Sequence, residues 1–272
     1  MRFEDRGDRS ILAQLYREAP LLVQQALYWD EALPGMPCVY LISTSGCVLQ
    51  GDRLYVEIAL GRRSLAHVTS QSATKVHEMD ANFASQVQTL TLAQDSYLEL
   101  MPGMIIPHRH ARYFARTDIT IDPTATLLFS EIVMPGRKHH RGGEMFEYDL
   151  YSTLINAQRP DGTNLFTEKL LIEPARWPVR LAGAMGGYDV FGTVVLLTPK
   201  PNADAILDQT AAGAQPGEST VAGANRLPND AGLIYKVLGP ESAPVRATIR
   251  EFWSLVRRTV LDVAIPAEPL WG

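Results

Sequence analysis

The chain has 272 residues, a formal net charge of −5 at pH 7 and 46% hydrophobic residues. A chain of this length can form one large domain or two small ones, and it is long enough to bury a core. We expect a single domain over residues 1–272. The acidic balance argues against nucleic acid as the main partner, because phosphate binding needs a basic surface.

The cysteine content and the N-terminal residues bear on where the protein works. Cys38 and Cys47 form no CxxC pair, which is typical of a reduced, cytosolic protein. Residues 1–9 are charged and mixed in sign, and no apolar region follows them as a signal peptide requires. No apolar run approaches the roughly 18 residues of a membrane span. We therefore expect a soluble, cytoplasmic protein with no membrane partner.

Alternating apolar and polar residues predict strands over most of the first two thirds of the chain, as in 54–60 and 118–122. Turn-forming residues between such strands lie at 61–64, 93–96, 122–125 and 159–162. This recurrence, roughly every 30 to 35 residues, fits a stacked, solenoid-like architecture. A series of hairpins in a sandwich explains the pattern equally well. Both arrangements predict a mainly β body.

A polar loop at 134–146 separates the predicted strands 125–133 and 144–151, and it contains His139, His140 and three glycines. Loops on rigid strands tend to carry function, although a solvated hairpin tip would look the same. The cluster at 77–80 is interpreted as another solvated turn.

The last third of the chain predicts helices. Residues 199–232 are rich in Ala, Gly, Pro, Asn and Asp, which indicates a loop-rich excursion with a short helix at 203–212 capped by Asn202. A strand follows at 233–238. An apolar stripe with i, i+4 spacing predicts an amphipathic helix at about 243–262, with Ser242 as cap and Pro244 in its first turn. The stripe is expected to pack on the sheet, although an exposed stripe would instead dock a partner.

The sequence contains few residues that compel a catalytic interpretation. It has no GxxxxGK[ST] phosphate loop, no HExxH helix and no GxSxG elbow, so we expect no enzyme activity. His108 and His110 could share one strand face as a metal pair. They resemble the first metal motif of cupins, but Gly103 is too close and the expected glutamate is missing.

Several segments together resemble the UreD/UreH-type urease accessory proteins. Residues 45–54 are similar to the family's GG-x-x-GGD-x-L segment, and 70–76 to its T-x-x-ATKV segment. Residues 98–102 resemble the following strand that ends in proline. Residues 129–137 and 143–146 resemble the acidic-x-x-x-PGR and GE-x-F pair, and 245–257 the C-terminal helix. The similarity runs in one order over nearly the whole chain.

The resemblance implies a mostly β, non-enzymatic maturation factor for the nickel enzyme urease. Such a factor would bind a UreF-like accessory protein and, through it, a UreG-like GTPase, and would dock on the urease structural subunits. Nickel would pass through it to the urease active site. We therefore expect transient Ni²⁺ and no tightly bound cofactor, because a tight nickel site would trap the cargo.

The residues that match the family motifs supply the candidate site. Asp52 and Glu131 are the acidic members of two motifs, and we expect them at interior positions on the nickel path. Two simpler interpretations remain open: Asp52 as a turn residue that bonds its own backbone, and Glu144 as the ion-pair partner of Arg137. The further candidates are Glu144, His108 and His110 for metal, Thr74 and Asp149 for the conduit lining, and Trp253 and Arg257 for a partner-docking helix. The alternative function is a cupin-like β-barrel metalloenzyme that uses His108/His110 and His139/His140.

Overall fold

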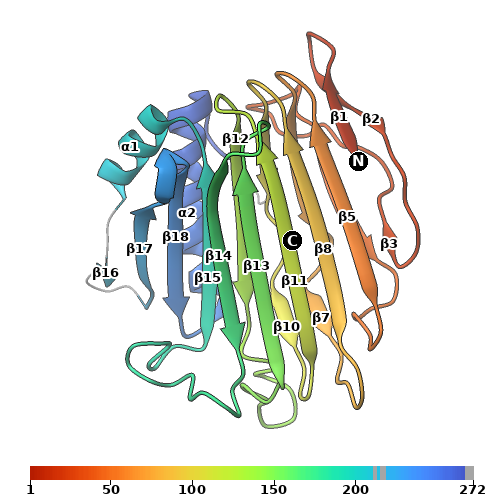
Figure 1. Cartoon of the computed structure of the whole chain (residues 1–272), viewed down its shortest axis with the longest axis vertical. Helices are drawn as coiled ribbons and strands as arrows, with labels where there is room; N and C mark the ends of the chain where they lie inside the picture. Colours follow the sequence, from red (N-terminus) through yellow and green to blue (C-terminus); the bar gives the residue numbers. More distant parts are fainter. Residues whose placement is uncertain (211–212, 215–218, 267–272) are drawn as a thin grey trace.

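The computed structural model describes residues 1–210, 213–214 and 219–266 and shows a mainly β fold of two stacked sheets (Figure 1). The seven-stranded sheet has the order β14 (Asn164–Ile172), β13 (Leu150–Gln158), β11 (Arg112–Ile121), β8 (Ala84–Leu92), β5 (Arg53–Leu60), β1 (Arg2–Asp5) and β2 (Ser10–Gln14). The eleven-stranded sheet has the order β16 (Gly213–Ala214), β17 (Val221–Arg226), β18 (Gly232–Gly239), β15 (Val190–Leu197), β12 (Thr126–Val133), β9 (Tyr97–Leu100), β6 (Leu65–Ser70), β4 (Cys38–Ser43) and β3 (Leu21–Leu22). Within the latter, β10 (Ile105–Pro107) pairs with β12 and with β7 (Thr74–Val76).

The chain winds as a solenoid between these sheets. It crosses from one sheet to the other at each step from β4 to β5, β6, β8, β9, β11, β12 and β13, and equivalent strands pair in parallel. Parallel partners such as Ala84 and Tyr113 lie about 30 residues apart, the length of one coil. The solenoid-like arrangement, one of the two predicted alternatives, is therefore confirmed.

The fourth predicted repeat differs from the others. The turn at 159–162 joins β13 and β14 as an antiparallel hairpin within one sheet, because Arg159 exchanges backbone hydrogen bonds with Gly162 and Thr163 and closes a tight turn. Both sheets are open, with β14 and β2 at the edges of one and β16 and β3 at the edges of the other. The β-barrel of the alternative interpretation is therefore wrong.

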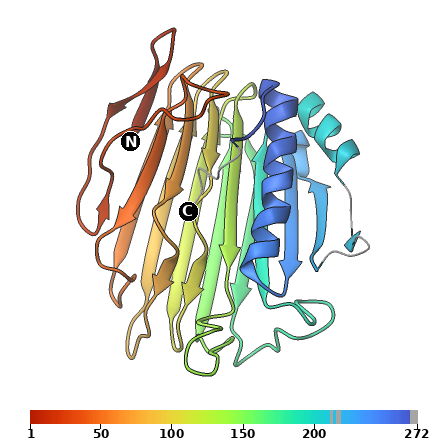
Figure 2. The same cartoon turned by 180° about the vertical axis from the view of Figure 1, so that it is seen from behind.

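Two helices cover one part of the outer face of the eleven-stranded sheet, over β12, β15, β17 and β18 (Figure 2). The C-terminal helix α2 (Ser242–Leu261) packs on β12, β15 and β18, as its apolar stripe predicted, and Val245, Ile249 and Val256 are fully buried. Its cap is Glu241, so the predicted Ser242 cap is wrong. Helix α1 (Lys200–Gln209) contacts α2 and begins at a Pro199 cap, so the predicted Asn202 cap is wrong. Residues 211–212 of that predicted helix lie outside the described residues.

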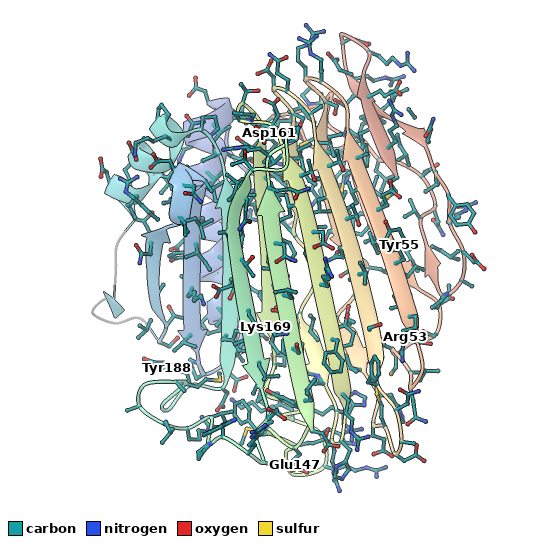
Figure 3. All side chains as sticks on the ribbon, viewed as in Figure 1. Arg53, Tyr55, Glu147, Asp161, Lys169 and Tyr188 are labelled. Atoms are coloured by element: carbon teal, nitrogen blue, oxygen red, sulfur yellow. The ribbon has the colours of Figure 1, made fainter. Side chains whose placement is uncertain are left out.

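The predicted loop-rich excursion also contains a strand, β17, and the short 3₁₀ helix Pro228–Asp230. Small residues such as Gly223 conceal this strand, because they lack the β-branched character typical of strands. The opposite face of the molecule is the outer face of the seven-stranded sheet. Tyr55 and Lys169 lie on this face, and α1 and α2 lie behind it (Figure 3).

Candidate functional site

Glu131 is an acidic side chain on the inner face of β12. The apolar core between the sheets includes Leu127 and Phe129, whereas Leu128 and Ile132 belong to the second core, under α2. Side chains alternate between the two faces of a strand, so Glu131 lies on the same face as Leu127 and Phe129. It replaces an apolar residue in the layer between the sheets.

A cavity of about 170 Å³ lies beside Glu131 between the sheets. Thr74 of β7 and Gln88 of β8 line it as well, so two of the predicted conduit residues, Glu131 and Thr74, are brought together. Burial raises the pKa of the Glu131 carboxyl to about 7, and the nearby Tyr151 hydroxyl offsets the rise in part. At neutral pH this carboxyl can therefore exchange a proton for a cation.

Tyrosine side chains surround the carboxyl. Tyr113 lines the cavity, and its ring stacks on that of Tyr151 with centroids 6.1 Å apart. The hydroxyl of Tyr148 is buried and has no hydrogen-bond partner among the described residues. Buried hydroxyls are normally satisfied by protein or ordered water, so this part of the interior suits water or a hydrated ion.

Further spaces adjoin the central cavity on both sides. A cleft of about 540 Å³ beside the β2–β3 segment shares Leu21, Leu41 and Val56 with the cavity. On the other side, a space of about 20 Å³ shares Phe129 and Glu131. The central cavity therefore lies between the N-terminal cleft on one side and the small space beside Glu131 on the other.

An ion pair links the two sheets at the small space beside Glu131. Glu168 of β14 and Lys236 of β18 line this space, and their side chains are 2.6 Å apart. Both are partly exposed, at 31% and 57%. Exposed ion pairs contribute little to stability, so opening this one costs little.

Asp52 and Asp149 lie away from this interior arrangement. Asp52 is half-buried in the turn before β5 and accepts a hydrogen bond from the Leu49 N–H at 2.8 Å. The turn interpretation therefore fits it, and the interior position does not. Asp149 accepts a hydrogen bond from Arg112 at 2.8 Å and lies 3.1 Å from His110 Nδ1, so it is part of a surface ion-pair cluster.

The PGR segment and the GE-x-F segment lie at the two ends of the 134–146 loop, and their side chains contact each other. Arg137 forms a bidentate ion pair with Glu144, which also accepts the Arg109 backbone N–H at 2.6 Å. Glu144 is therefore an ion-pair partner. Its burial opposes ionisation, but Arg137 and the Arg109 N–H lower its pKa. A Cβ on Gly136, whose φ is +139°, would lie 2.4 Å from the Glu144 carbonyl oxygen. Gly136, the glycine of the PGR segment, thus permits the close approach of the backbone at Glu144.

The histidines are grouped differently from the prediction. His110 is exposed and faces Asp149, whereas His108 is buried and its ring lies 5.7 Å from that of His77. His139 pairs with Glu241 at 3.1 Å, while His140 lines a polar cleft of about 350 Å³ together with His77 and His108. Neither predicted pair shares a site. Over residues 1–210, 213–214 and 219–266, no group of three or more His, Cys, Asp or Glu is placed to hold a metal ion.

Trp253 and Arg257 of α2 are fully buried, so the prediction that they dock a partner is wrong. Trp253 Nε1 and Arg257 Nε each donate to Glu99 Oε1 at 2.6 Å, and Arg257 also bonds Asp30 at 2.6 Å. His67 Nδ1 lies 2.8 Å from Glu99. Burial opposes ionisation of Glu99, but these partners lower its pKa to about 2. The network fixes α2 to β9 and to the segment that contains Asp30.

The sequence reasoning missed Glu99 and the tyrosines around Glu131. Tyr113 and Tyr151 occupy inward positions of β11 and β13 and are parallel partners. The alternation of apolar and polar residues along these strands could have predicted that both tyrosines face inward. Tyr148 and His77 lie in loops, where alternation gives no guidance.

None of the described helices is long and apolar enough to cross a membrane. Among similar proteins, the urease accessory protein UreD 2 of Brucella canis is 54% identical over 270 residues, covering 99% of this chain and 89% of that protein. UreD of Photorhabdus laumondii is 51% identical over 269 residues, with 99% and 84% covered. UreD of Yersinia pseudotuberculosis is 49% identical over 271 residues, with 100% and 84% covered. The model of the UreD urease accessory protein family matches residues 1–272, and this chain therefore belongs to that family, whose role is in urease maturation.

Proposed function

We propose that this chain is a non-enzymatic scaffold through whose interior nickel passes on its way to urease. It binds a UreF-like accessory protein and, through it, a UreG-like GTPase, and it docks on the urease structural subunits. The protein holds no resident cofactor, and Ni²⁺ is its cargo. The observation that supports this proposal is Glu131, a carboxyl in the apolar layer beside a row of adjoining spaces.

The chemistry of the interior suits a cation in transit. Carboxylate, hydroxyl and amide oxygens such as those of Glu131, Thr74 and Gln88 are weaker ligands for nickel than sets of thiolates or imidazoles. An ion that enters gains one carboxylate and can keep several waters. The proton that leaves Glu131 offsets part of the charge that the ion brings.

Cells that carry the cognate urease gene cluster test the maturation role. The gene for this chain is deleted and then restored, and urease activity and urease-bound nickel are measured. We expect deletion to leave urease present but poor in nickel, and restoration to fill it. Full nickel loading without this chain would contradict the proposal.

A second experiment separates a conduit from a purely structural adaptor. Restoration with Glu131→Ala is compared with restoration with Glu251→Ala, a change at an exposed position of α2 that lines none of these spaces. We expect only Glu131→Ala to lower urease-bound nickel, while pull-down of the accessory proteins stays intact for both variants. Normal nickel loading with Glu131→Ala would contradict the proposal that nickel passes through the interior. The protein would then act as a structural adaptor only.

A further inference from the structure

Two adjacent strand ends form one side of the polar cleft that holds His77 and His108. Strands β7 and β10 pair in parallel, with Val76 opposite Pro107. The next residue of each segment is a histidine, so the two imidazoles leave neighbouring strands side by side. Their ring centroids are 5.7 Å apart. Figure 3 labels Glu147 at this end of the molecule.

The 134–146 loop forms the other side of the cleft. Glu144 of this loop accepts a hydrogen bond from the backbone N–H of Arg109 at 2.6 Å, which fixes the loop beside the end of β10. The loop also adds His140 and Arg141 to the lining. The cleft has a volume of about 350 Å³, so it has room for a small ligand together with water.

Arginines outnumber carboxylates among the residues that line the cleft. The charged side chains of the lining are Arg109, Arg137, Arg141, Glu78 and Glu144. Glu144 is occupied by Arg137 in a bidentate ion pair, and Arg109 pairs with Glu147, outside the lining, at 3.2 Å. Glu78 is exposed, and its charge acts on Arg137, whose pKa is raised first by the hydrogen bond to Glu144. Among the described residues, Arg141 has no hydrogen-bond or ion-pair partner, so its guanidinium is available to a ligand.

Two imidazoles of the lining supply further donors. His108 is only 7% exposed, and its ring nitrogens have no hydrogen-bond partner in the part of the chain that the structure describes. They are not enclosed by protein, so they can be reached from the cleft. His140 is exposed, and its ring also lacks a hydrogen-bond partner among those residues. A neutral imidazole has one N–H to donate, and a polar group as buried as that of His108 normally has a partner.

The surroundings of His108 favour a negatively charged ligand. Burial is the main cause that lowers the pKa of its imidazole, and Arg137, His77 and Lys75 lower it further, whereas only Glu144 raises it. Three of the four titratable neighbours that act on this ring are therefore basic. A cleft lined mainly by groups of one sign attracts ligands of the opposite sign.

We propose that this cleft binds a small oxyanion of the phosphate or carboxylate class, with Arg141 as its main anchor and His108 and His140 as imidazole donors. The planar fork of an arginine matches the paired oxygens of both classes, and such charge-assisted hydrogen bonds are stronger than neutral ones. The proposal is independent of the passage of nickel, because none of these three residues lines the central cavity.

The test is a titration of the purified full chain with sodium phosphate and, separately, with sodium acetate, at neutral pH and constant ionic strength. Binding is followed by NMR of the histidine imidazoles. The resonances of His108 and His140 should shift, and the pKa of His108 should rise, because a bound anion stabilises the imidazolium. Arg141→Gln should weaken binding by about tenfold or more. Arg62→Gln, at an exposed arginine of the β5–β6 turn, removes the same charge outside the cleft and should bind like the wild type.

The two anions also identify the source of the ligand. Tighter binding of phosphate would assign the cleft to phosphate-like ions, and tighter binding of acetate would assign it to carboxylates, such as an acidic side chain of a docked protein. Equal affinity of the wild type and Arg141→Gln would overturn the proposal, as would an unchanged pKa of His108 in saturating anion. Shifts of the same size with sodium chloride would show screening alone and would also overturn it.

Discussion

The Glu131 carboxyl makes a prediction about stability that can be tested without any partner. We replace it with glutamine, which keeps the shape and removes the titration. Burial places the pKa of the native carboxyl at about 7, against an ordinary value of 4.5. Between these pH values the native protein holds a proton that the unfolded chain has released. The free energy of unfolding of the wild type must therefore fall as pH rises through this window.

The expected size follows from the same pKa values. At about 1.4 kcal/mol for each pH unit, a rise from 4.5 to about 7 corresponds to a loss of at most ~3 kcal/mol by pH 8. This is an upper bound, because the carboxyl borders a cavity that can admit water. The glutamine of Glu131→Gln does not titrate, so this variant loses no free energy of unfolding in this way. It should be more stable than the wild type at pH 8 and closer to it at pH 5.

The assay is urea unfolding at several pH values between 5 and 8, followed by tryptophan fluorescence and circular dichroism. The difference between the two proteins should grow steadily with pH. Glu251→Gln, at an exposed position of α2, serves as the control and should follow the wild type. A difference that does not change with pH, or one that shrinks as pH rises, would refute the reasoning about Glu131.

Three further predictions concern stability and use urea unfolding as the measurement. Arg257→Ala leaves Glu99 and Asp30 buried without their cation, so a loss of about 3–5 kcal/mol is expected; a loss below 1 kcal/mol would show that the network is dispensable. Gly136→Ala brings a Cβ to 2.4 Å from the Glu144 carbonyl oxygen, and should cost more than about 2 kcal/mol through backbone strain; wild-type stability would mean that the loop relaxes freely. Trp177→Ala removes a side chain that is 62% exposed and should change stability by less than about 0.5 kcal/mol; a larger loss would place Trp177 in a packed contact.

The β fold and the coil length could be predicted because turns recur at regular spacing along the chain. The choice between solenoid and sandwich could not, since both give strands with the same two-residue alternation. What decides it is the parallel pairing of residues such as Ala84 and Tyr113 in successive coils. This pairing depends on long-range register, which short-range patterns do not encode.

The candidate site was predicted only in part for similar reasons. Glu131 follows inward apolar positions on its strand, so its interior place was readable. Arg257 lies four residues after Trp253 on the buried face of α2, but its charge made burial hard to anticipate without knowledge of Glu99. Asp52 follows a glycine and satisfies a local turn, which the motif match concealed. His77 and His108 become neighbours only through the pairing of β7 with β10.

The stacked coils have one more consequence, which concerns length. Because equivalent strands pair in parallel, the space between the sheets runs across the strands, from coil to coil, rather than along them. Neighbouring strands are about 4.8 Å apart. Each coil of about 30 residues therefore extends the interior by one such step and leaves its width, set by the spacing of the two sheets, unchanged. In such an architecture the number of coils sets the length of the interior. The inward-facing residues of one coil can be substituted without changing those of the next.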